Sequence, residues 1–442
     1  MKLNLKERNG ITLIALVITI IMLLILAGVT IATLTGDNGI LGKANEAKTT
    51  NDEEKAKEQI KIAVMGSYGK DGELNYDDLT KNLGQIGITG LPDTASYPLK
   101  VTLDGVKATI KANGEVEFGK TIEVGDYVDY DPTLEANASD LTYTSTADKT
   151  GADSNQKFNA STYKEAGYGW RVLGVSNGKI RLISEEPIGP GTYTDNSRTY
   201  YTLYGKKGYI NGIEELNKIS AIFGHGKGAE KATSITVEDI NAITGYNPTT
   251  AKYGEGNFNE YGNKVTYTRG EGTALSSSAT NGQKWSGTQN TFNYYDKTNK
   301  TFKTLTSGST EITSTGYSYN PTTLNEDIAK PIKGVDESGV YNTEYQMLFG
   351  KYTVDQNNYF RSFTGKGTIP NYWLASDWAD AGGAGVNWGL RLVDFGNVRS
   401  SGSLCYSGGG EYSLSDRVRP VVSLKSDVSL EWNDTAGEWK MK

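Results

Sequence analysis

The chain has 442 residues, enough for about three domains by length alone, and its 53 glycines and 28 tyrosines predict a strand- and loop-rich protein with aromatic cores. The formal net charge is −7 and no basic stretch alternates with aromatic residues, which argues against nucleic acid as a partner. One cysteine, Cys405, and one histidine, His225, exclude an intrachain disulfide and zinc sites built on Cys or His, so no metal or cofactor is expected.

The N-terminus combines a charged leader with an apolar run. Residues 1–10 (MKLNLKERNG) end in Asn9-Gly10, and the charge-free stretch from Ile11 to Leu34 follows at once. At about 1.5 Å per residue this stretch is long enough to cross a hydrocarbon core of about 30 Å. The basic residues of the leader place that end on the cytoplasmic side. An uncleaved signal anchor is one interpretation.

The leader also resembles that of type IV prepilins, in which a prepilin peptidase cleaves after the glycine. The resemblance implies processing at Gly10, N-methylation of Ile11, a membrane anchor in residues 11–34, and other pilins as assembly partners. One position departs from the family, because Ala15 stands where a glutamate usually neutralises the terminal amine of a neighbouring subunit. A buried unpaired amine is costly, so Ala15 argues against a major shaft subunit and leaves a minor, tip or membrane-retained protein.

Helical spacing and two turn signals follow the apolar run. Ile60, Ala63 and Val64 lie at helical spacing, and Asp104-Gly105 and Asn113-Gly114 are typical of hairpin turns. The pilin resemblance implies a long helix over residues 11–66 and a small antiparallel β-hairpin region over 67–120.

A second, larger domain is expected over residues 121–430. Two strands are predicted around Asn177-Gly178 and one helix over 211–224. A second helix is expected to be capped by Thr236 with Asp239 and to end at Gly245. Residues of about 249–345 have weak periodicity and are interpreted as an insertion or long loops outside the core. Residues 431–442 are expected to form a C-terminal tail.

The last part of this domain carries the sharpest motifs, YWLAS from Tyr372, GLR from Gly389 and VRPVV from Val418. They resemble the C-type-lectin-like fold shared by formylglycine-generating-enzyme-like domains and by the variable proteins of diversity-generating retroelements. The resemblance implies that Trp373, Trp388, Arg391 and Arg419 are scaffold, with the arginines paired to backbone or carboxylate. The fold class predicted is therefore α+β, with a pilin-like long helix and small antiparallel sheet followed by a C-type-lectin-like mixed domain of short strands and two helices.

Between these scaffold positions lie Tyr, Ser, Gly and Asn residues, the repertoire of adaptable binding surfaces. Retroelement mutagenesis of adenine-rich codons tends to deliver the same residue types, so the resemblance implies a hypervariable binding face. Trp378 and Tyr412 are the expected aromatic anchors. The alternative is a long polar excursion without a partner. The predicted ligand-binding residues are Trp378, Ala379, Asp380, Gly382, Ala384, Asn387, Asp394, Asn397, Ser400, Ser401, Ser403, Cys405, Tyr406, Ser407, Gly409, Tyr412, Ser415 and Asp416.

No catalytic residues are predicted. Cys405 stands alone among Ser and Gly, His225 lies in a glycine-rich loop, and the adjacent Glu185 and Glu186 point to opposite faces of a strand. The sequence therefore predicts a binding protein at the cell surface, anchored in the cytoplasmic membrane or a pilus, for an extracellular protein or glycan ligand. A structural minor pilin or pseudopilin without a specific ligand and a formylglycine-generating-type enzyme are the rival hypotheses.

Overall fold

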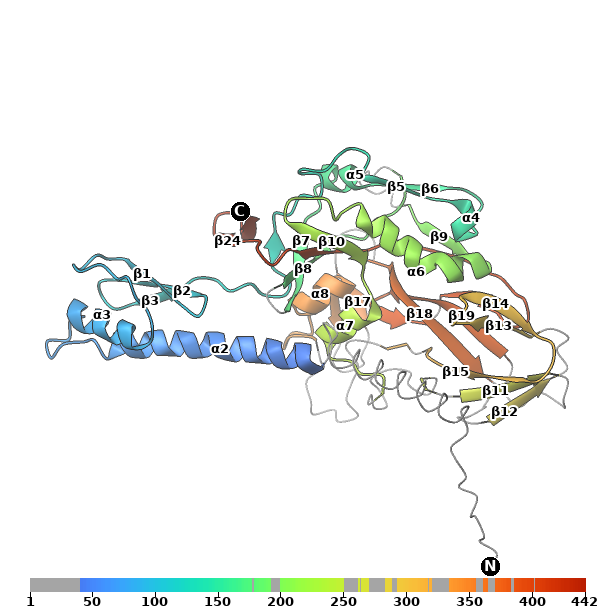
Figure 1. Ribbon diagram of the computed structural model, residues 1–442, viewed down its shortest axis with the longest axis horizontal. Coiled ribbons are helices and arrows are strands. Elements are labelled where there is room, and N and C mark those ends of the chain that lie inside the picture. The colour runs from blue at the N-terminus through green and yellow to red at the C-terminus, as the bar shows by residue number, and fades with distance from the viewer. Residues whose placement is uncertain are drawn as a thin grey trace, which may run out of the picture. The chain divides into compact units, whose positions relative to one another are not determined.

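The chain divides into two compact units, one ending at Thr121 and one beginning at Ile122 (Figure 1). The computed structural model describes residues 40–176, 179–191, 199–249, 261–262, 264–269, 283–287, 292–316, 318–319, 334–354, 361–364, 370–382, 385–400 and 402–442. The predicted leader with Gly10 and Ile11 and the apolar run 11–34 lie outside these residues. Within them, no helix has the length and apolar character needed to span a membrane.

The first unit is a pair of helices with a small antiparallel sheet. Its elements are α2 (Ile40–Met65), α3 (Tyr76–Gln85), β1 (Leu99–Leu103), β2 (Val106–Ile110) and β3 (Val116–Phe118). Leu103 pairs with Val106 and Ile110 with Val116, so both predicted hairpin turns are confirmed. Ile60 and Val64 of α2 are buried against the sheet side chains, because residues four apart share one face of a helix.

The second unit contains a seven-stranded sheet in the order β10-β23-β8-β7-β4-β25-β24. Only the β25–β4 pairing is parallel among these neighbours. Residues 431–442, expected to be a tail, instead form most of the β24–β25 hairpin of this sheet. The strands are β4 (Tyr127–Val128), β7 (Trp170–Ser176), β8 (Lys179–Ser184), β10 (Ala229–Ser234), β23 (Pro420–Leu424), β24 (Leu430–Asn433) and β25 (Glu438–Met441).

A four-stranded sheet and several two- or three-stranded ones complete the strand content of the second unit. The polar segment after β19 forms three short strands, of which two pair with β19 and one with β9. The remaining strands are β5 (Thr142–Ser145), β6 (Gln156–Asn159), β9 (Tyr201–Tyr204), β11 (Lys264–Arg269), β12 (Gln283–Gly287), β13 (Phe292–Asp296), β14 (Thr301–Leu305), β15 (Ser309–Thr313), β16 (Tyr352–Val354), β17 (Arg361–Phe363), β18 (Tyr372–Gly382), β19 (Gly385–Asp394), β20 (Asn397–Arg399), β21 (Ser403–Tyr406) and β22 (Ser413–Asp416).

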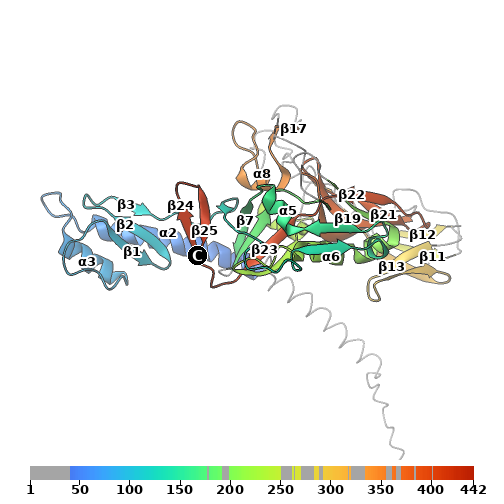
Figure 2. The same ribbon diagram turned by 90° about the horizontal axis from the view of Figure 1, so that it is seen from above.

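The longest helix of the second unit, α6, packs between the β5–β6 hairpin and β18–β19 (Figures 1 and 2). Its buried face includes Leu216 and Ile219, each of which stabilises the fold by about 1.5–3 kcal/mol through burial. A Cβ atom added to Gly212 would lie 2.7 Å from Cδ1 of Leu390, so the glycine permits close packing. The helices here are α4 (Ala147–Thr150), α5 (Ala160–Glu165), α6 (Gly205–Ala221), α7 (Val237–Thr244) and α8 (Thr343–Phe349).

Local turn chemistry explains α7. Thr236 and Asp239 form the predicted capping box, and Gly245 ends the helix with φ of 66°. These predictions are confirmed. The predicted helix over 211–224 corresponds to α6, which begins earlier, at Gly205, and ends earlier, at Ala221. The early start was not predicted because interior glycines weaken the helical pattern in the sequence.

The predicted α+β fold class, with one long N-terminal helix and a domain of short strands and two helices, is wrong. Among the residues that the structure describes, strands (39%) outweigh helices (21%), and they form several sheets beside seven helices. No long N-terminal helix over residues 11–66 is evident in the described part of the chain. The helix α2 is described from Ile40 to Met65. In the second unit, β18 and β19 run for 11 and 10 residues, and the described residues contain five helices where two were expected.

The predicted exclusion of residues 249–345 from the core is also wrong. Val265, Tyr267, Phe292 and Leu305 are buried in the main core cluster, and the ring centroids of Tyr267 and Phe292 are 4.4 Å apart. The sequence periodicity is weak here because a few large aromatic side chains supply the buried surface.

Candidate ligand-binding pocket

A pocket of about 540 Å³ lies beside the N-terminus of α6, within the range typical of small-molecule sites. Its walls come from α4 and the turn after it, from the end of β9 with the first turn of α6, and from the chain just before β22. The lining residues are Ala147, Asp148, Gly151, Ala152, Tyr204, Lys206, Lys207 and Glu411.

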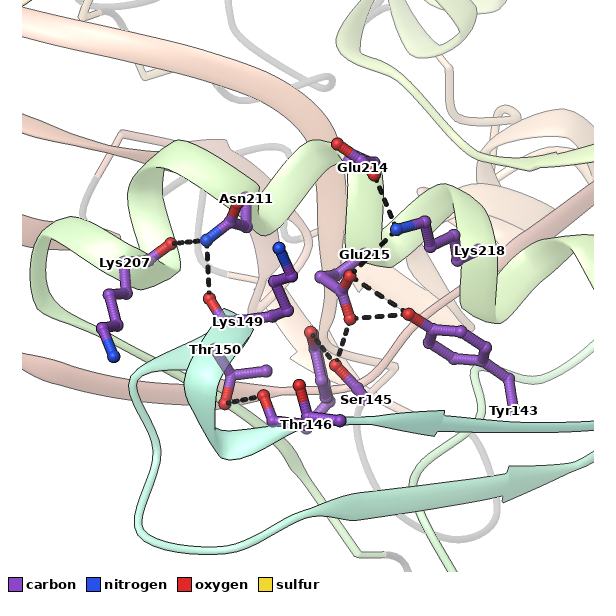
Figure 3. Close-up of polar contacts among 11 residues, drawn as sticks. Tyr143, Ser145, Thr146, Lys149, Thr150, Lys207, Asn211, Glu214, Glu215 and Lys218 are labelled. Atoms are coloured by element: carbon purple, nitrogen blue, oxygen red, sulfur yellow. Dashed lines mark hydrogen bonds and ion pairs between the residues drawn. The ribbon is translucent and has the colours of Figure 1, made fainter. Parts of the chain in front are cut away.

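Polar contacts join the first two walls. Nδ2 of Asn211 donates hydrogen bonds of 3.0 Å to the carbonyl oxygens of Lys149 and Lys207, which ties α4 to α6 (Figure 3). At the rim, Nζ of Lys207 lies 2.9 Å from Oδ1 of Asp148. The two helices therefore present a fixed edge to the pocket.

A buried carboxylate on α6 holds the strand that leads into α4. Glu215 is only 1% exposed, and it accepts hydrogen bonds from Oγ of Ser145 at 2.6 Å and from the hydroxyl of Tyr143 at 2.9 Å (Figure 3). Nζ of Lys218 lies 3.5 Å away. Burial, followed by the hydrogen bond to Glu215, raises the pKa of Tyr143 above its usual value. The cluster fixes β5 on α6 because each buried polar group has a partner.

Two glycines with positive φ allow the walls to approach closely. Gly151 has φ of 73°, and a Cβ atom there would lie 2.3 Å from the carbonyl oxygen of Tyr204. Gly205 has φ of 59°, and its Cβ atom would lie 2.2 Å from Oε2 of Glu411. Any other residue would be strained at both positive φ values. At Gly151 it would also meet backbone of the opposite wall, whereas at Gly205 it would displace the end of the Glu411 side chain.

The third wall continues into an exposed ribbon of two strands. β22 pairs with β9 so that Ser413 lies opposite Tyr204 and Ser415 opposite Thr202. We call these four residues the ribbon face, since side chains two apart on a strand share one side. Oγ1 of Thr202 and Oγ of Ser415 lie 2.7 Å apart. Tyr204 is 39% exposed, and the neighbouring Tyr412 is 48% exposed.

The structure distributes the predicted ligand-binding residues over very different environments. Three are exposed, namely Gly409, Tyr412 and Ser415. Eight are partly buried, namely Asp380, Gly382, Asn387, Asp394, Asn397, Ser400, Ser403 and Tyr406. Five are buried, namely Trp378, Ala379, Cys405, Ser407 and Asp416. Ala384 and Ser401 lie outside the described residues.

Burial gives several of these residues internal partners. The Trp378 indole, 3% exposed, donates a 3.1 Å hydrogen bond to the carbonyl oxygen of Leu390, so it does not offer an anchor to a ligand. The Cys405 side chain is fully buried, and burial raises the pKa of its thiol to about 12. Burial also raises the pKa of Asp416 to about 7. The structure thus leaves Tyr412 and Ser415 exposed in the chain that follows the pocket-lining Glu411, and it leaves Trp378 in the core.

The four residues expected to be scaffold are all buried. Arg419 donates to the carbonyl oxygens of Ser184, Met347 and Leu348, and its guanidinium lies 4.9 Å from the ring centroid of Tyr372. The remaining three also contact residues far away in the sequence. Trp373 donates to the carbonyl oxygen of Tyr201, Arg391 donates to that of Thr315, and the Trp388 ring packs edge-on against Phe302.

Sequence reasoning missed the pocket residues of α4 and α6. The buried Glu215, which lies behind the pocket, could have been identified from the sequence. It shares a helical face with Gly208, Gly212 and Ile219, and a charged residue on a buried face needs a polar partner. Asp148 and Lys207 carried no comparable signal. Across the described residues, no cluster of three His, Cys, Asp or Glu side chains is arranged to hold a metal ion.

No protein-family model, curated protein or solved structure matches this chain. The pilin and C-type-lectin-like resemblances therefore stay predictions from the sequence motifs.

Proposed function

We propose that the chain is a surface-displayed binding protein, anchored through residues 11–34, which binds an extracellular ligand at the pocket and the ribbon face. The observation that carries this proposal is the continuity between the two. Glu411 lines the pocket, Tyr412 and Ser413 follow it directly, and Tyr204 belongs to both surfaces. Exposed tyrosine beside small hydroxyl side chains supplies a rigid, amphipathic contact surface at low entropic cost.

The chemistry of the pocket favours binding over catalysis. Its described lining holds no histidine, serine or cysteine. The nearby Cys405 thiol stays protonated at neutral pH because its pKa is raised to about 12, and a nucleophile or oxidisable site needs the thiolate. A formylglycine-generating-type reaction at Cys405 is therefore not proposed.

The test uses intact cells that produce the full chain. Antibody labelling of the second unit on unbroken cells measures display, and the mass of the mature chain shows whether it begins at Ile11. Adhesion of these cells to immobilised extracellular matrix and glycan surfaces measures binding. We expect Tyr204→Ala to reduce adhesion without reducing labelling, and Tyr68→Ala to leave both unchanged, since Tyr68 is 42% exposed but belongs to the first unit.

The rival hypothesis, a structural minor pilin without a specific ligand, predicts a different result. If the labelled chain is incorporated into fibres and adhesion is the same for wild type, Tyr204→Ala and a deletion strain, the proposed binding function is wrong. Absence of surface labelling would contradict the display part of the proposal by itself.

A further inference from the structure

The charges around the pocket cancel. Two cationic residues, Lys206 and Lys207, and two anionic residues, Asp148 and Glu411, line it. Lys207 and Asp148 are already paired at 2.9 Å, although 59% and 81% of their side-chain surfaces stay exposed. Sites that select a charged ligand gather charge of one sign, so this lining gives no advantage to a strongly charged ligand.

The same charged groups retain a large hydrogen-bonding capacity. An ammonium group has three donors and a carboxylate about four acceptor sites, so one ion pair leaves most of them open. A hydroxyl group both donates and accepts, and two adjacent hydroxyls on a ligand match an ammonium next to a carboxylate. The ribbon face adds the hydroxyls of Ser413 and Ser415. The site is thus suited to a ligand with many hydroxyl groups.

Few side chains form the apolar part of the site. It consists of the half-exposed Tyr204 ring and the methyl groups of Ala147 and Ala152. A protein partner gains most of its affinity from large apolar or aromatic anchors in desolvated pockets, whereas this lining offers one aromatic ring beside four charged residues. A sugar ring, in contrast, presents a face of C–H groups to the electron-rich face of an aromatic ring and a rim of hydroxyls to polar groups.

We infer that the pocket binds a neutral saccharide, with the Tyr204 ring as the stacking surface and the Lys207–Asp148 pair and Glu411 as hydrogen-bonding partners of its hydroxyls. This inference rests on the proposed binding function and narrows its ligand to one chemical class. The pocket volume of about 540 Å³ lies in the range of small-molecule sites and so accommodates a sugar ring.

The test applies the detergent-solubilised full chain to one slide that carries neutral oligosaccharides, acidic oligosaccharides and peptides. The neutral oligosaccharide with the strongest signal is then titrated calorimetrically. We expect Tyr204→Ala and Lys207→Ala each to weaken its binding by about tenfold, the scale of one lost ring contact or hydrogen-bonding group. Tyr204→Leu, which keeps apolar bulk, serves as a second variant if Tyr204→Ala does not fold.

Lys179→Ala is the matched control for Lys207→Ala. Lys179 belongs to an exposed ion pair outside the pocket lining, with its Nζ 2.8 Å from Oε2 of Glu230, and its removal should leave binding unchanged. Binding only to acidic oligosaccharides or only to peptides would overturn the saccharide inference. If that binding depends on Tyr204, the proposed binding function stands. If Tyr204→Ala and Lys207→Ala bind neutral sugars with the same affinity as the wild type, the assignment of the binding site to this pocket is wrong.

Discussion

Ser145 and Glu215 lie 70 positions apart in the chain, yet Oγ of Ser145 donates a 2.6 Å hydrogen bond to the Glu215 carboxylate. Both residues are buried, and Oγ of Ser145 also lies 3.0 Å from the hydroxyl of Tyr201. This contact connects β5, whose end leads into the α4 wall of the pocket, to α6, which carries Lys206 and Lys207. The shape of the pocket thus depends on a polar cluster behind it that no ligand reaches.

Replacing the buried carboxylate should destabilise the second unit. Glu215→Ala removes the acceptor of the Tyr143 hydroxyl and leaves Oγ of Ser145 with the Tyr201 hydroxyl as its partner. A lost charge-assisted hydrogen bond or an unsatisfied buried group costs about 1–3 kcal/mol. We expect the free energy of unfolding to fall by about 2–4 kcal/mol. Denaturant unfolding followed by tryptophan fluorescence measures this change, because all seven tryptophans lie in the second unit.

The neighbouring Glu214 supplies the control. Its carboxylate is 68% exposed and lies 2.6 Å from Nζ of Lys218, so Glu214→Ala removes only a surface ion pair. Such an exposed pair contributes little to stability because solvent screens it. If Glu215→Ala and Glu214→Ala lowered the free energy of unfolding equally, the structural role assigned to the buried cluster would be wrong.

A second prediction concerns the close contact between the pocket walls. Gly151→Ala and Gly167→Ala both place a side chain at a positive φ, 73° and 75°, which costs about 1–2 kcal/mol. Only the Gly151 variant also meets backbone, at 2.3 Å from the Tyr204 carbonyl oxygen, whereas Gly167 has nothing within 4 Å. We expect Gly151→Ala to lose more stability, measured by thermal unfolding, and also to bind the pocket ligand more weakly. Equal thermal shifts and unchanged binding would show that the wall contact is not tight.

Turns and caps were predictable from the sequence because their chemistry is local. Asp104-Gly105 and Asn113-Gly114 form the expected hairpins, and Thr236 with Asp239 forms the expected cap. The start of α6 was missed because Gly208 disfavours helix in isolation, although close packing against Leu203 needs a residue without a side chain there. The start of α6 is therefore determined by tertiary contacts and not by local sequence preference.

The candidate site was predictable only on one of its walls. Glu411 lines the pocket and stands in the same polar segment as the predicted residues Tyr412 and Ser415. Asp148 and Lys207 come from elements more distant in the chain. Residue types alone also did not separate exposed from internal positions. Cys405 and Ser407 lie within the same polar run as Tyr412, yet both are fully buried because strand pairing turns them inward.

The buried Asp416 gives a third prediction, on pH. Burial raises its pKa from 3.8 to about 7, so the folded protein holds a proton that the unfolded chain releases between about pH 4 and pH 7. In that window the free energy of unfolding falls as the pH rises, by about 1.4 kcal/mol for each pH unit, and the loss is complete above the folded pKa. Asp416→Asn should flatten this decline. The measurement is denaturant unfolding between pH 4 and pH 8, with the exposed Asp427→Asn as control, and an unchanged slope in Asp416→Asn would contradict it.

The proposal of a hypervariable face, which the sequence resemblance suggests, leads to the last prediction. If retroelement mutagenesis acts on adenine-containing codons of residues 376–416, selection for a folded chain should retain substitutions mainly where side chains are exposed. We expect them at Tyr412 and Ser415, and we expect few at Cys405 or Trp378, where a changed volume would cost several kcal/mol in the core. Deep sequencing of the 3′ end of the gene across a population of the producing organism measures this distribution. A uniform sequence would end the retroelement hypothesis and leave a fixed binding site, whereas variation spread evenly over buried and exposed positions would mean that folding does not filter the changes.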